Sequence, residues 1–149
     1  MKKQTIAIGS DHAAINEKQA VIEFLKSKSV IVIDEGAYDS NSVDYPDYAL
    51  KVCKSVNDKK ADLGILICGT GIGMSMAANK IKGIRCALVG DTFSARMTKE
   101  HNNANVLALG ARVLGLGLML DIVDIFVSTE YSNDPRHQKR VDKVMGLEK

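Results

Sequence analysis

The sequence reads LGILICGTGIGMSMAAN from residue 63 to residue 79. Its first part, residues 63–68, is a short apolar run without polar alternation, which predicts a strand buried on both faces. Gly69, Gly71 and Gly73 then stand at alternate positions, and the residues after them follow a helical pattern over 74–79. A buried strand that enters a glycine-rich turn and then a helix is typical of a parallel α/β sheet.

The rest of the chain repeats this order of short apolar runs and helical patterns. We predict further strands over 5–9, 30–33, 86–89 and 106–109, and helices over 15–27, 48–56, 92–100, 114–127 and 135–145. This alternation predicts a Rossmann-like α/β fold, a three-layer sandwich in which a five-stranded parallel sheet has helices on both faces. No repeat or linker interrupts the pattern, so residues 1–149 are expected to form a single domain.

The composition of the chain argues against several classes of protein. The formal net charge is +2 and 46% of the residues are hydrophobic, so neither a nucleic-acid binder nor a membrane protein is indicated. The cysteines, Cys53, Cys68 and Cys86, form no CxxC pair. They argue against a disulfide scaffold or a zinc site and favour a cytoplasmic location. The longest apolar-rich stretch, residues 113–127, carries two aspartates and suits a packed helix.

Polar and reactive residues follow several of the predicted strands. Asp11 and His12 come after the first strand, a loop with Tyr45 after the second, Cys68 ends the third, and Arg112 follows the fifth. Ligands of doubly wound sheets bind beyond the carboxyl ends of the strands, so we expect the functional site at this edge. Tyr45 either lines that site or anchors its loop.

The glycine-rich turn is the strongest local indication of a site. Backbone N–H groups at the start of a helix attract anions, so the turn can hold a phosphate or a developing oxyanion. Helix N-termini also favour thiolates, which makes Cys68 a candidate base or nucleophile; the alternative is a small buried core residue. Cys53 and Cys86 are predicted to be core residues. The GxGxG spacing differs from the dinucleotide-binding GxGxxG, so a nucleotide site is not indicated.

The remaining candidates each have two interpretations from the residues alone. Asp11 and His12 can transfer protons or bind phosphate, or Asp11 can simply cap a helix. His101 is either a reactive group or a cation that suits a helix C-terminus. Arg136 and Arg140 share one helix face, where they either hold an anion or form a solvated charged surface.

A set of motifs extends this pattern along nearly the whole chain. The motifs are GSDHA (9–13), DYP (44–46), ILICGTGIG (65–73), AANK (77–80), GIR (83–85), HN (101–102), NVLALGAR (105–112) and RHQKR (136–140). In this order they resemble the ribose-5-phosphate isomerase B family, which includes the galactose-6-phosphate isomerase subunits. The ordered agreement is far more specific than any single motif.

The resemblance implies an aldose–ketose isomerase of the pentose phosphate pathway that interconverts ribose 5-phosphate and ribulose 5-phosphate through an enediolate, without a metal or an organic cofactor. Cys68 matches the proton-transferring cysteine; relatives with a glutamate base carry it in the next helix, where this chain has no acid. His101 matches the residue that opens the furanose ring, with Asp11 and Thr70 as helpers. The binding positions matched are Asp11, Tyr45, Asn102, the loop Gly69, Thr70, Gly71, Ile72 and Gly73, and the phosphate ligands His12, Arg112, Arg136 and Arg140.

The resemblance also implies a homodimer or a dimer of dimers with shared active sites and a C-terminal helix that extends to the partner subunit. A six-carbon sugar phosphate, allose 6-phosphate or galactose 6-phosphate, is the alternative substrate, although the paired arginines favour ribose 5-phosphate. Two other classes stay open from the residues. A cysteine hydrolase would use Cys68 as nucleophile and His101 as base, with a covalent acyl intermediate. A non-catalytic phosphate or nucleotide sensor would use the same glycine loop to bind its ligand without turnover.

Overall fold

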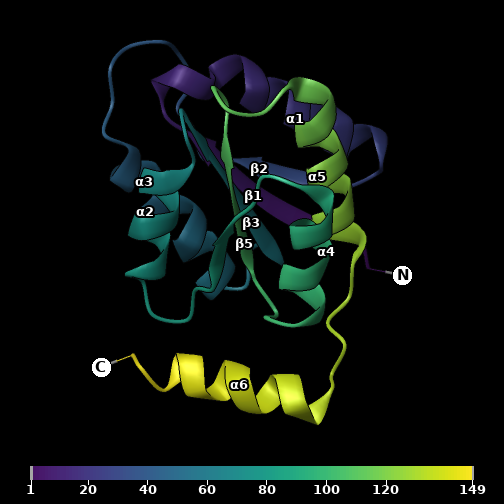
Figure 1. Cartoon of the computed structure of the whole chain (residues 1–149). Helices are drawn as coiled ribbons and strands as arrows, with labels where there is room; N and C mark the ends of the chain where they lie inside the picture. Colours follow the sequence, from purple (N-terminus) through teal and green to yellow (C-terminus); the bar gives the residue numbers. More distant parts are fainter. Residues whose placement is uncertain (1, 149) are drawn as a thin grey trace.

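The computed structural model describes residues 2–148 and contains a five-stranded sheet and its covering helices (Figure 1). The strands are β1 (Thr5–Ser10), β2 (Ile31–Asp34), β3 (Leu63–Cys68), β4 (Cys86–Leu88) and β5 (Val106–Gly110). The helices are the 3-10 turn η1 (His12–Ala14), α1 (Ile15–Ser27), α2 (Tyr45–Asn57), α3 (Ile72–Asn79), α4 (Thr92–Glu100), α5 (Leu116–Ser128) and α6 (Pro135–Met145).

All neighbouring strands of the sheet pair in parallel, in the order β2-β1-β3-β5-β4. Helices α1, α4 and α5 cover one face of the sheet, and α2 and α3 cover the other (Figure 1). The prediction of a five-stranded parallel sheet with helices on both faces is therefore confirmed. The chain reverses its direction of travel across the sheet between β1 and β3, the place where doubly wound folds open a crevice.

The central strands are apolar throughout because each of their faces meets a different core. In β3, Ile65 and Ile67 belong to the cluster beneath α1 and α5, whereas Leu66 and Cys68 belong to the cluster beneath α2 and α3. Burial of each large aliphatic side chain contributes roughly 1.5–3 kcal/mol. The edge strands β2 and β4 are only partly covered, and Leu88 of β4 is 46% exposed.

The start of α2 differs from the prediction, which placed Tyr45 in a loop. The helix begins at Tyr45, with Pro46 in its first turn, where proline's fixed φ and missing N–H cost nothing. The loop assignment was wrong because an aromatic residue before a proline reads as a turn. The start of α3 also lies earlier than predicted, at Ile72, so the helix opens directly behind Gly71.

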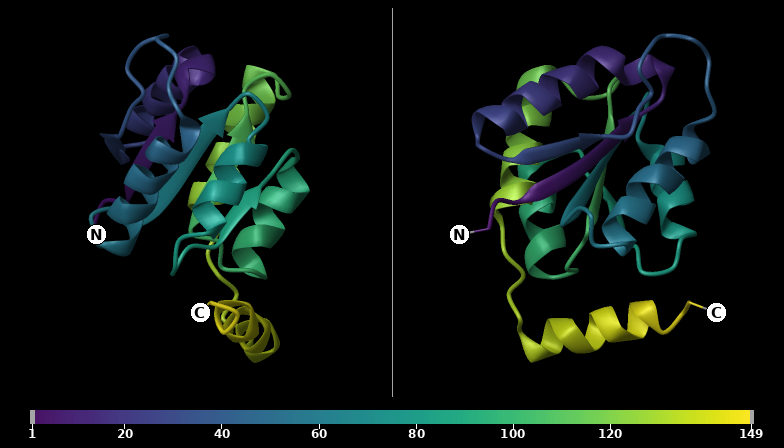
Figure 2. Two further views of the ribbon diagram at one scale, coloured as in Figure 1. Left: turned by 90° about the vertical axis from the view of Figure 1, so that its left-hand side faces the viewer. Right: turned by 180° about the vertical axis from the view of Figure 1, so that it is seen from behind.

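The last helix, α6, stands apart from the sandwich. Figures 1 and 2 show it crossing below the amino ends of the strands, at the far end of an extended segment that follows α5. It is held through His137 and Val141, the buried residues of an otherwise exposed helix. Within residues 2–148, none of the helices combines the length and the apolar character that a bilayer crossing requires.

Candidate active site

Cys68 is the last residue of β3 and lies directly beneath the glycine-rich turn. The backbone N–H of Gly71 donates to its Sγ at 3.1 Å, and Cys68 as a whole is 6% exposed. Gly71 has φ +78°, and a Cβ there would lie 2.8 Å from the carbonyl carbon of Leu109. Only glycine fits both the positive φ and this close approach, so the residue type at position 71 fixes the turn that caps the sulfur.

The turn is tied to the end of β5 by backbone hydrogen bonds. The N–H of Ala111 donates to Cys68 O at 2.9 Å, and the N–H of Arg112 donates to Gly69 O at 2.9 Å. The aliphatic part of the Arg112 side chain runs beside Gly69, where its Cδ lies 3.5 Å from the place of a Cβ. Thr70 Oγ1 accepts from the N–H of Ile72 at 3.2 Å, which orders the first turn of α3.

Asp11 and His12 stand beside this turn, since the N–H of Asp11 donates to Ile67 O at 3.2 Å. The Asp11 carboxylate accepts from the N–H of Ala13 at 2.9 Å, so it caps η1 as the simpler interpretation proposed. His12 Nδ1 accepts from the N–H of Val43 at 3.1 Å. The neutral ring therefore carries its proton on Nε2, which leaves a donor available for a ligand oxygen.

Tyr45 reaches the same edge from the other side. A Cβ at Gly73 would lie 2.6 Å from its ring, so the aromatic face packs directly on the first turn of α3. Together with the preceding contacts, the structure brings one set of predicted residues to the carboxyl edge of the sheet. We call this set the thiol group: Asp11, His12, Tyr45, Cys68, Gly69, Thr70, Gly71, Ile72, Gly73 and Arg112.

The other predicted residues lie at the opposite edge of the sheet. His101 follows the last turn of α4, where the chain returns to begin β5 at Val106. Arg136 and Arg140 are on α6, which passes below the same edge (Figure 1). A cavity of about 290 Å³ there is lined by His101, Asn102 and Arg140, together with two residues not predicted for the site, Arg85 and His137. We call His101, Asn102, Arg136 and Arg140 the imidazole group.

Within one chain, the structure does not bring the two groups together. Cys68 pairs with Gly110 at the carboxyl edge of the sheet, whereas His101 precedes the amino end of that same strand, β5. Asp11 and Thr70, the suggested helpers of His101, belong to the thiol group. They lie at the far edge of the sheet from the His101 of the same chain.

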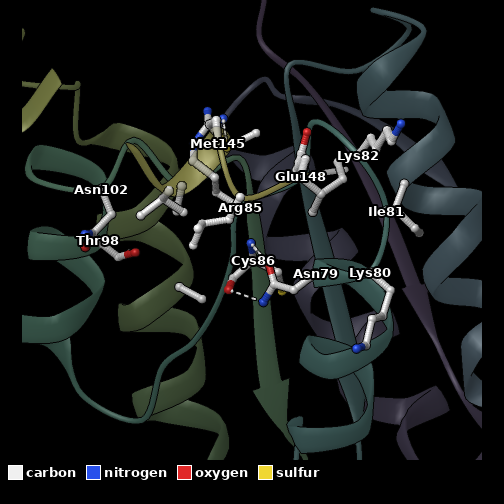
Figure 3. A pocket seen from close by; sticks show the side chains of 15 residues that line it. Asn79, Lys80, Ile81, Lys82, Arg85, Cys86, Thr98, Asn102, Met145 and Glu148 are labelled. Atoms are coloured by element: carbon white, nitrogen blue, oxygen red, sulfur yellow. Dashed lines mark hydrogen bonds between the residues drawn. The ribbon is translucent and has the colours of Figure 1, made fainter. Parts of the chain in front are cut away.

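A second cavity, of about 660 Å³, also lies at the amino edge, between α6 and the sandwich. Figure 3 shows Arg85, Met145 and Glu148 around it, with Asn79 hydrogen-bonded to Cys86 at its floor. Arg85 donates from Nε to Asn103 O at 2.8 Å, and burial lowers its pKa. His137 was not among the residues predicted for the site, although His137, Val141 and Val144 recur at a spacing that places them on one helix face.

The other cysteines are unsuited to proton transfer. Burial raises the pKa of both the Cys53 and the Cys86 thiols to about 12, so both stay protonated at neutral pH. Across the described chain, residues 2–148, no group of three or more His, Cys, Asp or Glu side chains could hold a metal ion.

Fold and site together define a doubly wound α/β protein with a cysteine beneath a glycine-rich turn and a second, cationic group at the opposite edge. Residues 6–144 match the family described as Ribose/Galactose Isomerase. The chain belongs to this family of sugar-phosphate isomerases, as the motifs predicted.

Individual relatives match over almost their whole length. The chain is 44% identical over 148 residues to ribose-5-phosphate isomerase B of Escherichia coli, covering 99% of this chain and 97% of that protein. The structure of Clostridium thermocellum ribose-5-phosphate isomerase B is similar with a TM-score of 0.95 and 50% identity, over 97% of both chains. The Mycoplasma genitalium enzyme, whose structure contains bound ribulose-5-phosphate, has a TM-score of 0.92 and 41% identity, over 99% of this chain and 98% of that one.

Proposed function

We propose that this isomerase interconverts ribose 5-phosphate and ribulose 5-phosphate, with Cys68 as the base that moves the proton. The observation that carries the proposal is the hydrogen bond from the Gly71 N–H to Cys68 Sγ, 3.1 Å long, at the start of α3. A peptide donor aimed at sulfur at the positive end of a helix stabilises a thiolate. The same relatives that share the fold carry this activity in their names.

The reaction needs one base and one site for negative charge. The Cys68 thiolate removes the proton from C2 of the open-chain aldose, and the electron pair of that bond forms the C1–C2 double bond of the enediolate. The backbone N–H groups of the turn stabilise the negative charge that develops on O1. The ketose forms when O1 gains a proton, the hydroxyl on C2 loses its proton to become the carbonyl, and a proton returns to C1. The protons balance, so no oxidant, reductant or cofactor is consumed. We assign the phosphate oxygens at this edge to His12 and Arg112.

The imidazole group of a second chain completes the site, because one chain holds its two groups at opposite edges of the sheet and cannot bring them into one site. We propose a homodimer in which the thiol group of each subunit faces the partner subunit's His101, Asn102, Arg136 and Arg140. In this arrangement His101 opens the furanose ring, and the two arginines bind the phosphate. A two-fold axis makes both sites equivalent, as in most homo-oligomers.

Exposed apolar side chains next to the thiol group favour such a partner. Ile72 and Met76 of α3 are 46% and 64% exposed, and Phe93 at the start of α4 is 66% exposed. Leu88 of the edge strand β4 lies against Gly71 and is also exposed. Apolar side chains gathered over neighbouring elements mark an interaction surface, and a second copy is the occupant that also completes the site. We place the enzyme in the cytoplasm, where unpaired cysteines are stable.

The test is a ribose 5-phosphate assay in the presence of a metal chelator, comparing wild type with Cys68→Ala. We expect activity that survives the chelator and falls by roughly 10²–10⁴ in the variant, the usual contribution of a positioned base. Cys86→Ala is the matched control, because it removes a thiol that stays protonated. Its activity should stay close to that of wild type.

The same assay separates the competing functions. Allose 6-phosphate and galactose 6-phosphate, tested side by side, should give a lower kcat/KM than ribose 5-phosphate. In deuterium oxide, the product of an isomerase acquires deuterium at carbon, whereas a hydrolase would accumulate an acyl-cysteine. Full activity of Cys68→Ala would refute the role of the sulfur, and absence of turnover on all three sugars would refute the proposed reaction.

A further inference from the structure

Two stacked imidazoles join α6 to the end of α4. The ring centroids of His101 and His137 lie 4.2 Å apart, with their planes tilted by 38°. His101 is exposed at the end of its helix, whereas His137 is only 8% exposed. The stack therefore packs the exposed His101 side chain, at the end of a helix, against the buried ring of His137.

His137 is itself fixed from several sides. Its Nδ1 lies 3.0 Å from Ser132 Oγ, and that oxygen also accepts from the N–H of Asp134 at 3.3 Å. Val141 lies one turn further along the same face of α6 and is buried as well. The segment before α6, the helix itself and the hydroxyl thus fix the His137 ring, and contact with this fixed ring restricts the orientation of His101.

We propose that His137 is a positioning residue for ring opening, which holds the His101 imidazole in the orientation that meets the furanose. The inference rests on the proposed function, in which His101 exchanges protons with the cyclic sugar. In that step the anomeric hydroxyl loses a proton, the bond from C1 to the ring oxygen breaks, and the ring oxygen gains a proton. The rate of such a step depends steeply on geometry, since a misplacement of about 1 Å can cost about 100-fold.

The cavity at this edge supports the assignment. Its polar lining consists of Arg85, His101, Asn102, His137 and Arg140. Nδ1 of His137 lies within hydrogen-bond distance of Ser132 Oγ, whereas the exposed His101 ring has no side-chain hydrogen bond within residues 2–148. The stacked pair thus contains one ring held by the protein and one ring available to a substrate.

A purely structural role for His137 predicts a different outcome. If the residue served only to attach α6, its loss would displace Arg140 and weaken phosphate binding. The kcat/KM of every phosphorylated substrate, cyclic or open-chain, would then fall by the same factor. A positioning role in ring opening affects only substrates that arrive as rings, so a pair of substrates separates the two roles.

The experiment compares ribose 5-phosphate with 4-deoxyribose 5-phosphate, which lacks the hydroxyl that closes the furanose and is therefore open-chain. We expect His137→Ala to lower kcat/KM by about tenfold or more on ribose 5-phosphate and by less than about threefold on the deoxy sugar. His137→Phe keeps an aromatic ring in the stack and should restore most of the loss. Val141→Ala loosens the same helix face but keeps both imidazoles of the stack, and it should change kcat/KM on both substrates by one common factor.

His101→Ala, assayed on both sugars, distinguishes a failure of the proposed ring opening by His101 from a failure of the positioning role of His137. If that variant loses activity on both sugars equally, ring opening by His101 is wrong and the inference falls with it. If His101→Ala discriminates between the sugars and His137→Ala does not, the positioning role alone is overturned. A His137→Phe enzyme as impaired as His137→Ala on ribose 5-phosphate would likewise overturn positioning by the stack.

Discussion

At the scale of single residues, the chemistry depends on one sulfur and one peptide N–H. Gly71 is the residue that joins them, because it donates the N–H, and its positive φ and lack of a side chain let the turn approach β5. The environment of Cys68 differs from that of Cys53, which belongs to α2, is buried in the core and has no hydrogen-bond donor to its sulfur within residues 2–148. Position relative to a helix end, rather than residue type, separates a candidate base from a packing residue.

A first prediction follows from Gly71→Ala. The new Cβ would lie 2.6 Å from Leu88 and 2.8 Å from the backbone of Leu109, in a conformation that alanine disfavours. We expect kcat to fall by about 10²-fold as the N–H leaves the sulfur, and stability to fall by about 1–3 kcal/mol. Gly117→Ala is the matched control, since nothing lies within 4 Å of its Cβ position in α5. It should retain activity; a wild-type kcat for Gly71→Ala would contradict the role of the turn.

A second prediction concerns the pH dependence of stability. Burial raises the pKa of the Cys53 and Cys86 thiols to about 12, whereas unfolded thiols titrate near pH 8.5. The unfolded chain therefore loses these protons first, so the free energy of unfolding is unaffected below about pH 8 and falls as pH rises from about 9 towards 12. Each thiol contributes a slope of about 1.4 kcal/mol per pH unit in that window.

Urea denaturation at pH 7, 9, 10 and 11 measures this slope. The double variant Cys53→Ala/Cys86→Ala should show a shallower alkaline decline than wild type, whatever its stability at pH 7. Cys68→Ala serves as a comparison with a single thiol removed elsewhere. Identical alkaline slopes for wild type and the double variant would contradict the raised pKa of the buried thiols.

At the scale of elements, the segment 35–44 that leads into α2 depends on one buried ion pair. Lys18 Nζ contacts Asp34 Oδ1 at 2.6 Å and donates to Ala37 O at 2.6 Å, although Lys18 is only 2% exposed. Near its end the segment contacts His12, whose Nδ1 accepts from the N–H of Val43. The ion pair thus connects the packing of α1 to a residue of the thiol group.

The third prediction is that Lys18→Met lowers the free energy of unfolding by about 2–3 kcal/mol, because it leaves a partly buried carboxylate without its partner. The loosened segment should also raise KM and speed amide exchange over residues 35–44. Lys54→Met removes an exposed pair with Asp58, 2.8 Å apart, and should cost less than about 0.5 kcal/mol. Equal losses of stability in the two variants would refute the importance of the buried pair.

The elements themselves followed closely from the sequence, for a physical reason. Strands covered on both faces are short, apolar and unalternating, and β3 and α1 begin and end where the pattern placed them. Helix starts were harder, because the first turn is chosen by backbone geometry. Gly71 at positive φ sets the start of α3, and Pro46 permits α2 to begin at Tyr45. Neither helix start is marked by a change in the hydrophobic period of the sequence.

At the scale of the whole molecule, the division of the site into two groups could be predicted from the sequence only in part. In a parallel sheet each strand runs towards one edge and the following helix runs back, so the end of α4 must lie at the amino edge. His101 could therefore have been placed far from Cys68 by topology alone. Arg136 and Arg140 could not, since α6 follows the last strand, and only the three-dimensional structure shows which edge it crosses.

The fourth prediction tests this division by mixing two inactive enzymes. Cys68→Ala damages only the thiol group, and His101→Ala only the imidazole group, so a dimer with one subunit of each kind has one doubly damaged site and one intact site. Random reassociation after joint unfolding gives half mixed dimers, and we expect about a quarter of the wild-type activity. Cys68→Ala mixed with Arg112→Ala is the control, because both lesions lie in the thiol group and no intact site can form. Recovery in that control would mean that Arg112 and Cys68 reach a site from different subunits, which would contradict the composition of the thiol group. No recovery in the first mixture would mean that each subunit builds its site alone, and Cys68 would then have to meet the histidine of its own chain across the full length of the sheet.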